Sequence, residues 1–478
     1  MNPKRKKLKL DDKVCLFINL PKELLKKIIS HLNFDEIKKL ISTCTCFYRM
    51  RNLIDIPIIN IAKCEQLFYR DPNSSLIKYD DTGPESPGMQ YIRTLNCFNK
   101  VNYISFAQRK LKNGESITCR KPINILEKIK NIKNTKGVDF TRWVLRHDAF
   151  KNTALDAICP NISCLVMRQT MILQNENLRN VFQNTSSWRQ LNILTIWSKV
   201  SSEVVCQILK ECNGLTFLDI ENIRIYFLDN PNCKVNILTT IRMYCKKLKV
   251  LKLPETDYWA KQVKTCLMGS SMKLNILTGN VIDYDTTRPL CDTFAGKTIL
   301  SNLTHLVSTP KIFYSYGKIT SLNQKWLLVN MSKKLIVFDC KWFVLTQTFI
   351  KMLSTCCPDL KYLYATCYDK DENLKGYFLR EIGMRLPLLT ELRLILFSKG
   401  LFNNDYVNMR TQLCLNDDDL IDTLGNFLHL KYLSLYDYIF NDEIITRIKI
   451  KSLGITFNNK NIDTTHSISH FDWFNTKN

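Results

Sequence analysis

The sequence CKKLKVLKL at residues 245–253 contains the pattern that decides the fold. Its leucines follow the template L-x-x-L-x-L, in which apolar and polar positions alternate as they do in a strand with one buried face. A helical stretch precedes this strand, and Cys245 with two lysines forms the connection between them. Such a unit buries its apolar side only against neighbours of the same kind, so it predicts a repeat array.

The same template recurs along most of the chain. Successive copies start 24 to 41 residues apart between residues 162 and 430. Helices are expected between them at residues 203–211, 238–244, 346–355, 378–386 and 420–428. Four copies replace the last apolar position of the template by Gly279, Ser308, Cys340 or Ala365, which leaves the register open there. The copies begin at Ile162, Leu191, Leu215, Leu248, Leu274, Leu303, Leu335, Leu360, Leu389, Leu430 and Ile450.

Cysteine recurs at the connection between helix and strand. Cys159, Cys212, Cys245 and Cys357 each lie just before a strand, where a small buried apolar residue fits between helix and strand. The 19 cysteines contain no Cys-x-x-Cys pair, and the pair His466 to His470 lacks two further metal ligands. We therefore expect reduced thiols, no bound metal and no cofactor.

The period and the cysteines resemble the cysteine-containing subtype of leucine-rich repeat. The resemblance implies an α/β solenoid with a parallel sheet on the concave face and helices on the convex face. We expect degenerate entry repeats at residues 89–160, with strands at 91–98 and 138–140, leucine-rich repeats at 161–457 and a C-terminal tail at 458–478.

The sequence LPKELLKKIISHL at residues 20–32 predicts a separate helical module before the repeats. Pro21 suits the first position of a helix, and Glu23 places a negative charge near the positive end of the helix dipole. Asp35 is a good N-cap for a second helix, and Phe47 anchors a third. Three short helices bury little apolar surface, so part of the apolar stripe is expected to be covered by a partner. The stripe of the first helix contains Leu24, Leu25, Ile28, Ile29 and Leu32.

These residues resemble an F-box over residues 15–55. The resemblance implies that the module docks on a Skp-type adaptor and through it on a cullin-based SCF ubiquitin ligase. An unrelated helical cap on the following domain is the alternative. The residues that the resemblance places at or beside the adaptor are Leu20, Pro21, Leu24, Leu25, Ile28, Ile29, Leu32, Leu40, Cys44 and Phe47.

The remaining segments and the charge suggest where the protein works. Residues 1–14 form a basic tail, in which residues 3–7 resemble a nuclear import signal or are simply a solvated tail, and residues 56–88 form a connector and linker. Neither a signal peptide nor a run of about 18 apolar residues occurs, so we expect nucleus or cytoplasm and no membrane. The 68 Lys and Arg outnumber 44 Asp and Glu, but they are spread out, which favours an acidic or phosphorylated protein target over nucleic acid.

Catalytic signatures are absent. Residues 296–298 read Gly-Lys-Thr like the end of a phosphate-binding loop, but Cys291 occupies the position of its first glycine. We assign no catalytic residue and expect a non-catalytic protein.

Target binding is expected on the concave face, where side chains alternate with the buried leucines. Aromatic residues and arginine are common anchors of binding surfaces, although the group could also be an ordinary surface or be covered by a loop. The expected function is that of a substrate receptor of an SCF ligase; an interaction scaffold outside a ligase and a basic nuclear nucleic-acid binder are the alternatives. The expected target-binding residues are Trp197, Phe217, Tyr362, Tyr364, Arg393, Tyr432 and Tyr436.

Overall fold

The computed structural model divides the chain into two compact units, Met1–Lys199 and Val200–Asn478. The described residues are 21–30, 32, 36–37, 39–40, 55–60, 68–70, 77–79, 92–93, 95–98, 100–106, 126, 128–130, 132–141, 144–145, 155–168, 171–172, 188–197, 199–200, 202–225, 231–254, 259, 263, 266–267, 272–279, 299–308, 331–368, 375–397, 417–436, 443, 445–447 and 455–457.

Parallel strands in chain order form the sheet of the first unit. Each strand pairs with the next, and the register aligns Ser105, Asp139 and Val166 across three of them. The strands are β1 (Asp55–Asn60), β4 (Lys100–Ser105), β5 (Gly137–Asp139), β7 (Cys164–Arg168) and β9 (Ile193–Trp197). The helices of this unit include α1 (Lys22–Ser30), α6 (Leu155–Ile158) and the 3-10 turn η5 (Ile132–Asn134).

Short strands accompany this sheet. The antiparallel pair β2 (Phe68–Arg70) and β3 (Ile77–Tyr79), together with most of β1, falls in the segment 56–88 that the sequence marks as a connector. β6 (Val144–Leu145) pairs with β8 (Met171–Ile172) in parallel. β10 (Lys199–Val200) lies at the boundary of the two units, and β12 (Arg224–Ile225) belongs to the second unit.

The strand expected at residues 91–98 is wrong. Ile92, Arg93 and Leu95 are helical, and the strand that follows, β4, begins at Lys100. Ile92, Leu95 and Phe98 are buried, whereas Arg93 is exposed. This spacing of three residues between buried side chains is that of a helical turn and not of a strand. The second expected strand, at 138–140, overlaps β5.

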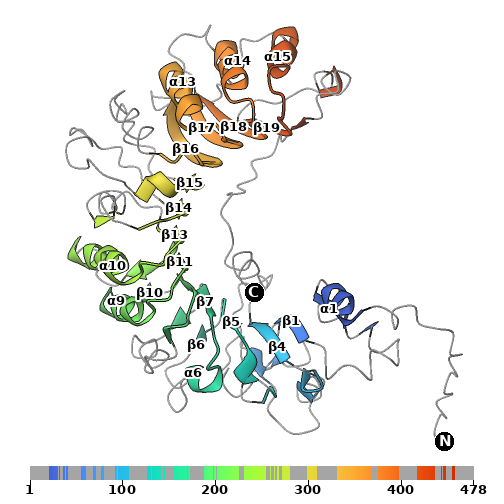
Figure 1. Ribbon diagram of the computed structural model, residues 1–478, viewed down its shortest axis with the longest axis vertical. Helices are drawn as coiled ribbons and strands as arrows, with labels where there is room; N and C mark the ends of the chain where they lie inside the picture. The colour runs from blue at the N-terminus through green and yellow to red at the C-terminus, as the bar shows by residue number, and fades with distance from the viewer. Residues whose placement is uncertain are drawn as a thin grey trace, which may run out of the picture. The chain divides into compact units, whose positions relative to one another are not determined.

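The second unit is an α/β solenoid of parallel strands in chain order. Its helices lie together on one side of the strands (Figure 1), and we call the other side of this sheet the open face. None of the described helices is long and apolar enough to cross a membrane. The strands are β11 (Phe217–Asp219), β13 (Val250–Lys252), β14 (Ile276–Thr278), β15 (His305–Val307), β16 (Val337–Leu345), β17 (Tyr362–Tyr368), β18 (Glu391–Phe397), β19 (Tyr432–Tyr436) and β20 (Thr456–Phe457). The helices are α9 (Ser202–Glu211), α10 (Pro231–Tyr244), η7 (Ile299–Asn302), α13 (Gln347–Cys356), α14 (Lys375–Arg385) and α15 (Asp417–Leu424).

The predicted register holds where the template is poorest. Leu277, Leu306 and Phe338 align in adjacent strands. The four small residues at the last template position are all buried. Gly279 has φ +115°, and a Cβ at this position would lie 2.8 Å from the carbonyl carbon of Leu253, so only glycine fits without strain.

The core contains the recurring cysteines as the sequence predicts. Cys159, Cys212, Cys245 and Cys357 are fully buried, and the described cysteines are free thiols. The thiol of Cys357 donates a weak hydrogen bond to the carbonyl oxygen of Ser332, at 3.7 Å, from one repeat to the one before. These cysteines therefore pack helix against strand.

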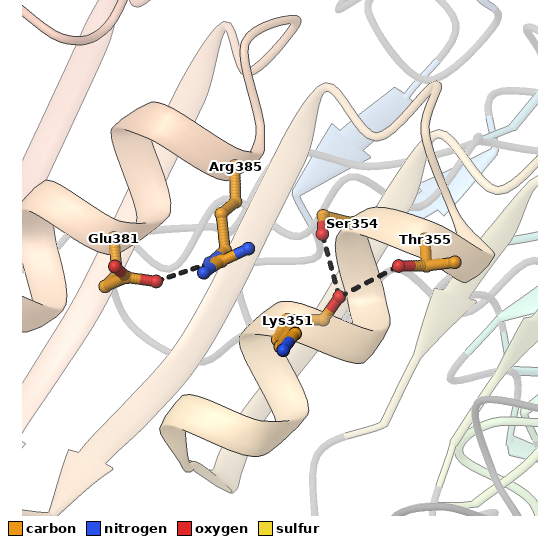
Figure 2. A network of polar contacts seen from close by, with 5 residues as sticks. All are labelled: Lys351, Ser354, Thr355, Glu381 and Arg385. Carbon is orange, nitrogen blue, oxygen red and sulfur yellow. Dashed lines mark hydrogen bonds and ion pairs between the residues drawn. The ribbon is translucent and has the colours of Figure 1, made fainter.

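Polar side chains on the helices bond locally (Figure 2). On α14, Arg385 forms an ion pair with Glu381 one turn earlier. On α13, the hydroxyls of Ser354 and Thr355 donate to the carbonyl oxygen of Lys351 at 2.8 and 3.2 Å. Such contacts within one helix satisfy the polar groups without any partner element.

Candidate functional site

Helix α1 presents two apolar side chains to solvent. Pro21 precedes it, Glu23 lies in its first turn and Lys27 in its last, as the helix dipole favours. Leu24 and Ile28 are 48% and 37% exposed, and a spacing of four residues puts them on one face of the helix. This pair of exposed apolar side chains is a candidate docking surface.

The other side of α1 is anchored in the first unit. Ile29 is buried, and the helix contacts β1. Leu32 is half-buried and the amide N–H of this residue donates to the carbonyl oxygen of Ile29 at 3.0 Å. Ile29 thus packs internally, whereas Leu24 and Ile28 face outward.

The rest of the expected helical module is described only in part. Residues 36–37 and 39–40 are helical, with Ile37 fully buried and Leu40 half-buried. Leu20, Cys44, Phe47 and the side chain of Leu25 lie outside the described residues. The three-helix arrangement stays a prediction.

Four of the expected target-binding residues come together on the open face of β17, β18 and β19. The register places Tyr362 beside Glu391 and Glu391 beside Tyr432 in one row. In the row two residues further along, Tyr364 lies beside Arg393. We call these five residues, Tyr362, Tyr364, Glu391, Arg393 and Tyr432, the tyrosine–arginine cluster.

Arg393 is the centre of this cluster. Its guanidinium carbon lies 5.9 Å from the ring centroid of Tyr364 and 5.2 Å from that of Tyr432. Nε and Nη2 of Arg393 lie 2.7 and 2.6 Å from Oε1 of Glu391. The cation is thus held between two aromatic rings and one carboxylate, while the three tyrosines stay half-buried and keep an accessible surface.

Sequence reasoning missed Glu391 as a member of the cluster. The sequence contains the information needed to find it: Glu391 and Arg393 are two residues apart on one strand, so their side chains are on the same face of the sheet.

The remaining expected target-binding residues lie elsewhere. Phe217 on β11 is fully buried, with Nζ of Lys252 5.6 Å from its ring centroid, so it offers no accessible surface and its assignment to a binding surface is corrected. The alternation of apolar and polar residues predicts which face a side chain is on but not whether that face is covered. Trp197 belongs to the first unit and is half-buried. Tyr436 ends β19, and its side chain lies outside the described residues.

Trp197 takes part in a second charged group, on the sheet of the first unit. The guanidinium carbon of Arg168 lies 4.3 Å from its ring centroid, and the two residues are paired in the register of β7 and β9. Nearby, burial raises the pKa of Asp139, although hydrogen bonds from Thr141 and Ser105 and the charge of Arg168 oppose this effect. The Thr141 amide donates to Oδ1 of Asp139 at 2.8 Å.

The chemistry of these groups is that of binding. Burial raises the pKa of Cys159, Cys245 and Cys357 to about 12, so these thiols stay protonated at neutral pH and are poor nucleophiles. The accessible groups of the cluster are its three tyrosines, which lie around a largely buried ion pair and suit recognition of another molecule.

Comparison with known proteins identifies the N-terminal module. Residues 17–61 match the model of the F-box domain, which confirms the F-box resemblance and includes α1 and β1. No curated protein matches the sequence. Among solved structures, an internalin from Listeria monocytogenes aligns with a TM-score of 0.38 and 13% identity, covering 81% of this chain and 87% of that one. A leucine-rich-repeat protein from Leptospira interrogans aligns with a TM-score of 0.33 and 14% identity, covering 77% and 85%.

Proposed function

We propose that this chain, an F-box domain joined to leucine-rich repeats, is the substrate-recognition subunit of an SCF-type ubiquitin ligase. The observation that carries the proposal is that the F-box match includes α1, the helix that exposes Leu24 and Ile28. The F-box would bind a Skp-type adaptor and the repeats would bind a protein target. Catalysis by proximity then needs no catalytic residue in this chain, because the other ligase subunits supply the transfer chemistry.

The tyrosine–arginine cluster is the proposed target site. Tyrosine and arginine combine a large contact area with hydrogen-bonding groups and are enriched among the residues that dominate binding energies. The net charge of +24 favours an acidic or phosphorylated target through long-range attraction. The basic segment at residues 3–7 is consistent with work in the nucleus as well as the cytoplasm.

The adaptor surface can be tested with the full chain and a purified Skp-type adaptor. Fully burying a leucine or isoleucine contributes about 1.5–3 kcal/mol, so covering the exposed parts of Leu24 and Ile28 should contribute roughly 2 kcal/mol. The double variant Leu24→Asp with Ile28→Asp loses this contribution to the binding free energy, and binding would also bury its two new carboxylates against the adaptor. We expect adaptor affinity at least roughly 100-fold lower, by calorimetry, with an unchanged circular dichroism spectrum.

A matched control uses an apolar pair with the same exposure elsewhere. Met384 and Leu388 are 50% and 39% exposed, and Met384→Asp with Leu388→Asp should leave adaptor affinity unchanged. Equal loss in both double variants, or no binding by the natural chain, would overturn the adaptor proposal. Adaptor binding without turnover of any target that the repeats capture would favour an interaction scaffold outside a ligase.

A further inference from the structure

The turns that lead from helix to strand in the second unit share one backbone design. Before β13 the amide of Leu248 donates to the carbonyl oxygen of Cys245 at 3.1 Å, and before β16 the amide of Leu335 donates to that of Ser332 at 3.1 Å. Because the strands are parallel, all these turns lie at the edge of the sheet where strands begin.

Lysines are concentrated at this edge. We call them the basic rim, and they belong to the turns and first residues of the repeats from β13 to β19. Seven of them are exposed and Lys249 is half-buried. The basic rim consists of Lys246, Lys247, Lys249, Lys273, Lys333, Lys334, Lys361 and Lys431.

Backbone hydrogen bonds link the turns of the rim from strand to strand, and the turns before β15 and β18 contribute none of its lysines. Lys361 N–H donates to the carbonyl oxygen of Ile336 at 2.9 Å, Thr390 N–H to that of Lys361 at 2.8 Å, and Lys431 N–H to that of Thr390 at 2.8 Å. Each bond advances by one strand, about 4.8 Å, so Lys361 and Lys431 are separated by about 10 Å. Lysines in directly adjacent turns, such as those before β13 and β14 or before β16 and β17, start about 4.8 Å apart, which is within the Debye length of about 8 Å at physiological salt.

The charge of the rim is largely uncompensated. Among the described residues of these turns Asp359 is the one carboxylate, which leaves a net charge of +7. Within the described part of the chain, none of the eight lysines forms an ion pair with a carboxylate. Like charges this close repel one another, and an anionic partner would relieve that repulsion.

Exposed apolar side chains accompany these lysines. Leu388 lies in the turn before β18 and is 39% exposed, and Leu428 lies in the turn before β19 and is 74% exposed. A phosphate backbone has no apolar groups to cover such side chains. A polypeptide that contains both acidic and apolar residues does, so the combination favours a polypeptide over a nucleic acid.

We propose that the basic rim, with Leu388 and Leu428, binds an acidic polypeptide segment of a partner protein. The carboxylates of the segment face the rim lysines, and its apolar side chains cover the two leucines. This surface is the edge of the sheet, whereas the proposed adaptor site is α1 and the proposed target site is on the open face. The inference therefore goes beyond the proposed function and does not depend on adaptor binding.

The test measures binding of labelled probes to the full chain by fluorescence anisotropy at low salt. The probes are a peptide of Glu-Glu-Leu-Glu repeats, a peptide of Glu-Glu-Ser-Glu repeats of the same length, and a single-stranded oligonucleotide of equal charge. We expect the leucine peptide to bind most tightly. Lys333→Glu with Lys334→Glu should weaken its binding by about tenfold, because several exposed charge contacts are lost and reversed.

Two further variants complete the test. Lys351→Glu with Arg380→Glu makes the same charge change at exposed positions on α13 and α14, and it should leave binding within about twofold. Leu388→Ser with Leu428→Ser should weaken the leucine peptide several-fold, roughly the effect of partly covered apolar groups, and leave the serine peptide unchanged.

Three results would overturn the proposal. One is an equal loss of binding in the rim variant and in the helix variant, which would mean that the charge acts without a defined site. Another is oligonucleotide binding as tight as that of the leucine peptide with the same loss in the rim variant, which would indicate a phosphate-binding edge. The third is no binding of the leucine peptide. Leu24→Asp with Ile28→Asp, which should abolish adaptor binding, should keep peptide binding. Failure of the rim proposal can therefore be told apart from failure of the adaptor proposal.

Discussion

Removal of Arg393 should destabilise the second unit more than its position near the surface suggests. The guanidinium donates to one oxygen of Glu391, and the two side chains are only 11% and 14% exposed. Arg393→Met keeps most of the apolar stem but removes the cation from a carboxylate that is largely shielded from water. A charge left in such a site without its cation is costly.

The magnitude follows from these contacts. Breaking one side of a buried ion pair costs about 3–5 kcal/mol. The two tyrosine rings beside Arg393 contribute about 0.5–1 kcal/mol each at partly exposed sites. We therefore expect Arg393→Met to lower the free energy of unfolding by about 4 kcal/mol. The double variant with Glu391→Gln removes both charges and should cost only about 1–2 kcal/mol, close to the loss of the ring contacts alone.

Urea denaturation of the full chain, followed by circular dichroism, measures these differences. Lys361→Met is the control, because it removes an exposed positive charge one residue before β17 and should change stability by less than about 0.5 kcal/mol. The reasoning would be refuted if the effects of Arg393→Met and Glu391→Gln added to the effect of the double variant within about 0.5 kcal/mol.

Three other predictions follow from backbone and burial. Gly279→Ala should lower the free energy of unfolding by about 1–3 kcal/mol, because φ is +115° and the added Cβ would lie 2.8 Å from the carbonyl carbon of Leu253; an unchanged urea midpoint would contradict this. Burial raises the pKa of Asp139, so the folded chain keeps this proton to higher pH than the unfolded chain does. The stabilisation from this group is therefore fully present below the unfolded pKa and is lost as the pH rises through the folded pKa. In denaturation experiments, the stability of the natural chain relative to Asp139→Asn should rise as the pH is lowered from about 7 to about 4. Iodoacetamide at about pH 8 should modify exposed Cys97 and spare Cys357, whose pKa burial raises to about 12, until denaturant is added; mass spectrometry of the peptides reports which thiol reacts.

The repeat register could be predicted from the sequence for most strands, because the apolar template repeats the same physical requirement. It is wrong for the last copy, which starts at Ile450 and would place Leu453 beside Leu433, whereas β19 and β20 pair Leu433 with Phe457. Leu277, Leu306 and Phe338 align as expected even though the residues after them in the template are small. Segment 91–98 was mispredicted because its apolar residues are too few to separate a period of two from a period of three. Ile92 and Leu95 then pack as one helical turn.

The candidate target site could be predicted only in part. The register brings Tyr364 and Arg393 side by side, which the template implies once strands are aligned. How deeply a side chain on the open face is buried depends on contacts with residues distant in sequence, which the local apolar pattern does not contain. Phe217 occupies an equivalent position to Tyr362 in its own strand, yet it is fully buried whereas Tyr362 is half-buried.

Strand length offers a physical reason for this difference along the second unit. β11, β13, β14 and β15 have three residues each, whereas β16, β17 and β18 have nine, seven and seven. Longer neighbouring strands extend the pleated surface that holds aromatic side chains in rows. Two of the three accessible tyrosines, Tyr362 and Tyr364, lie on the long strand β17, and Tyr432 lies on β19, which has five residues.

The three proposed surfaces differ in chemistry, and salt should separate them. Leu24 and Ile28 are apolar, so adaptor binding should change little between low and physiological salt. The basic rim contacts its partner through exposed charges, which salt screens over about 8 Å at physiological ionic strength. Arg393 has a mostly buried counter-ion, and its interactions are screened less. A salt titration in which adaptor binding weakened as steeply as binding of the acidic peptide would therefore argue against apolar docking through α1.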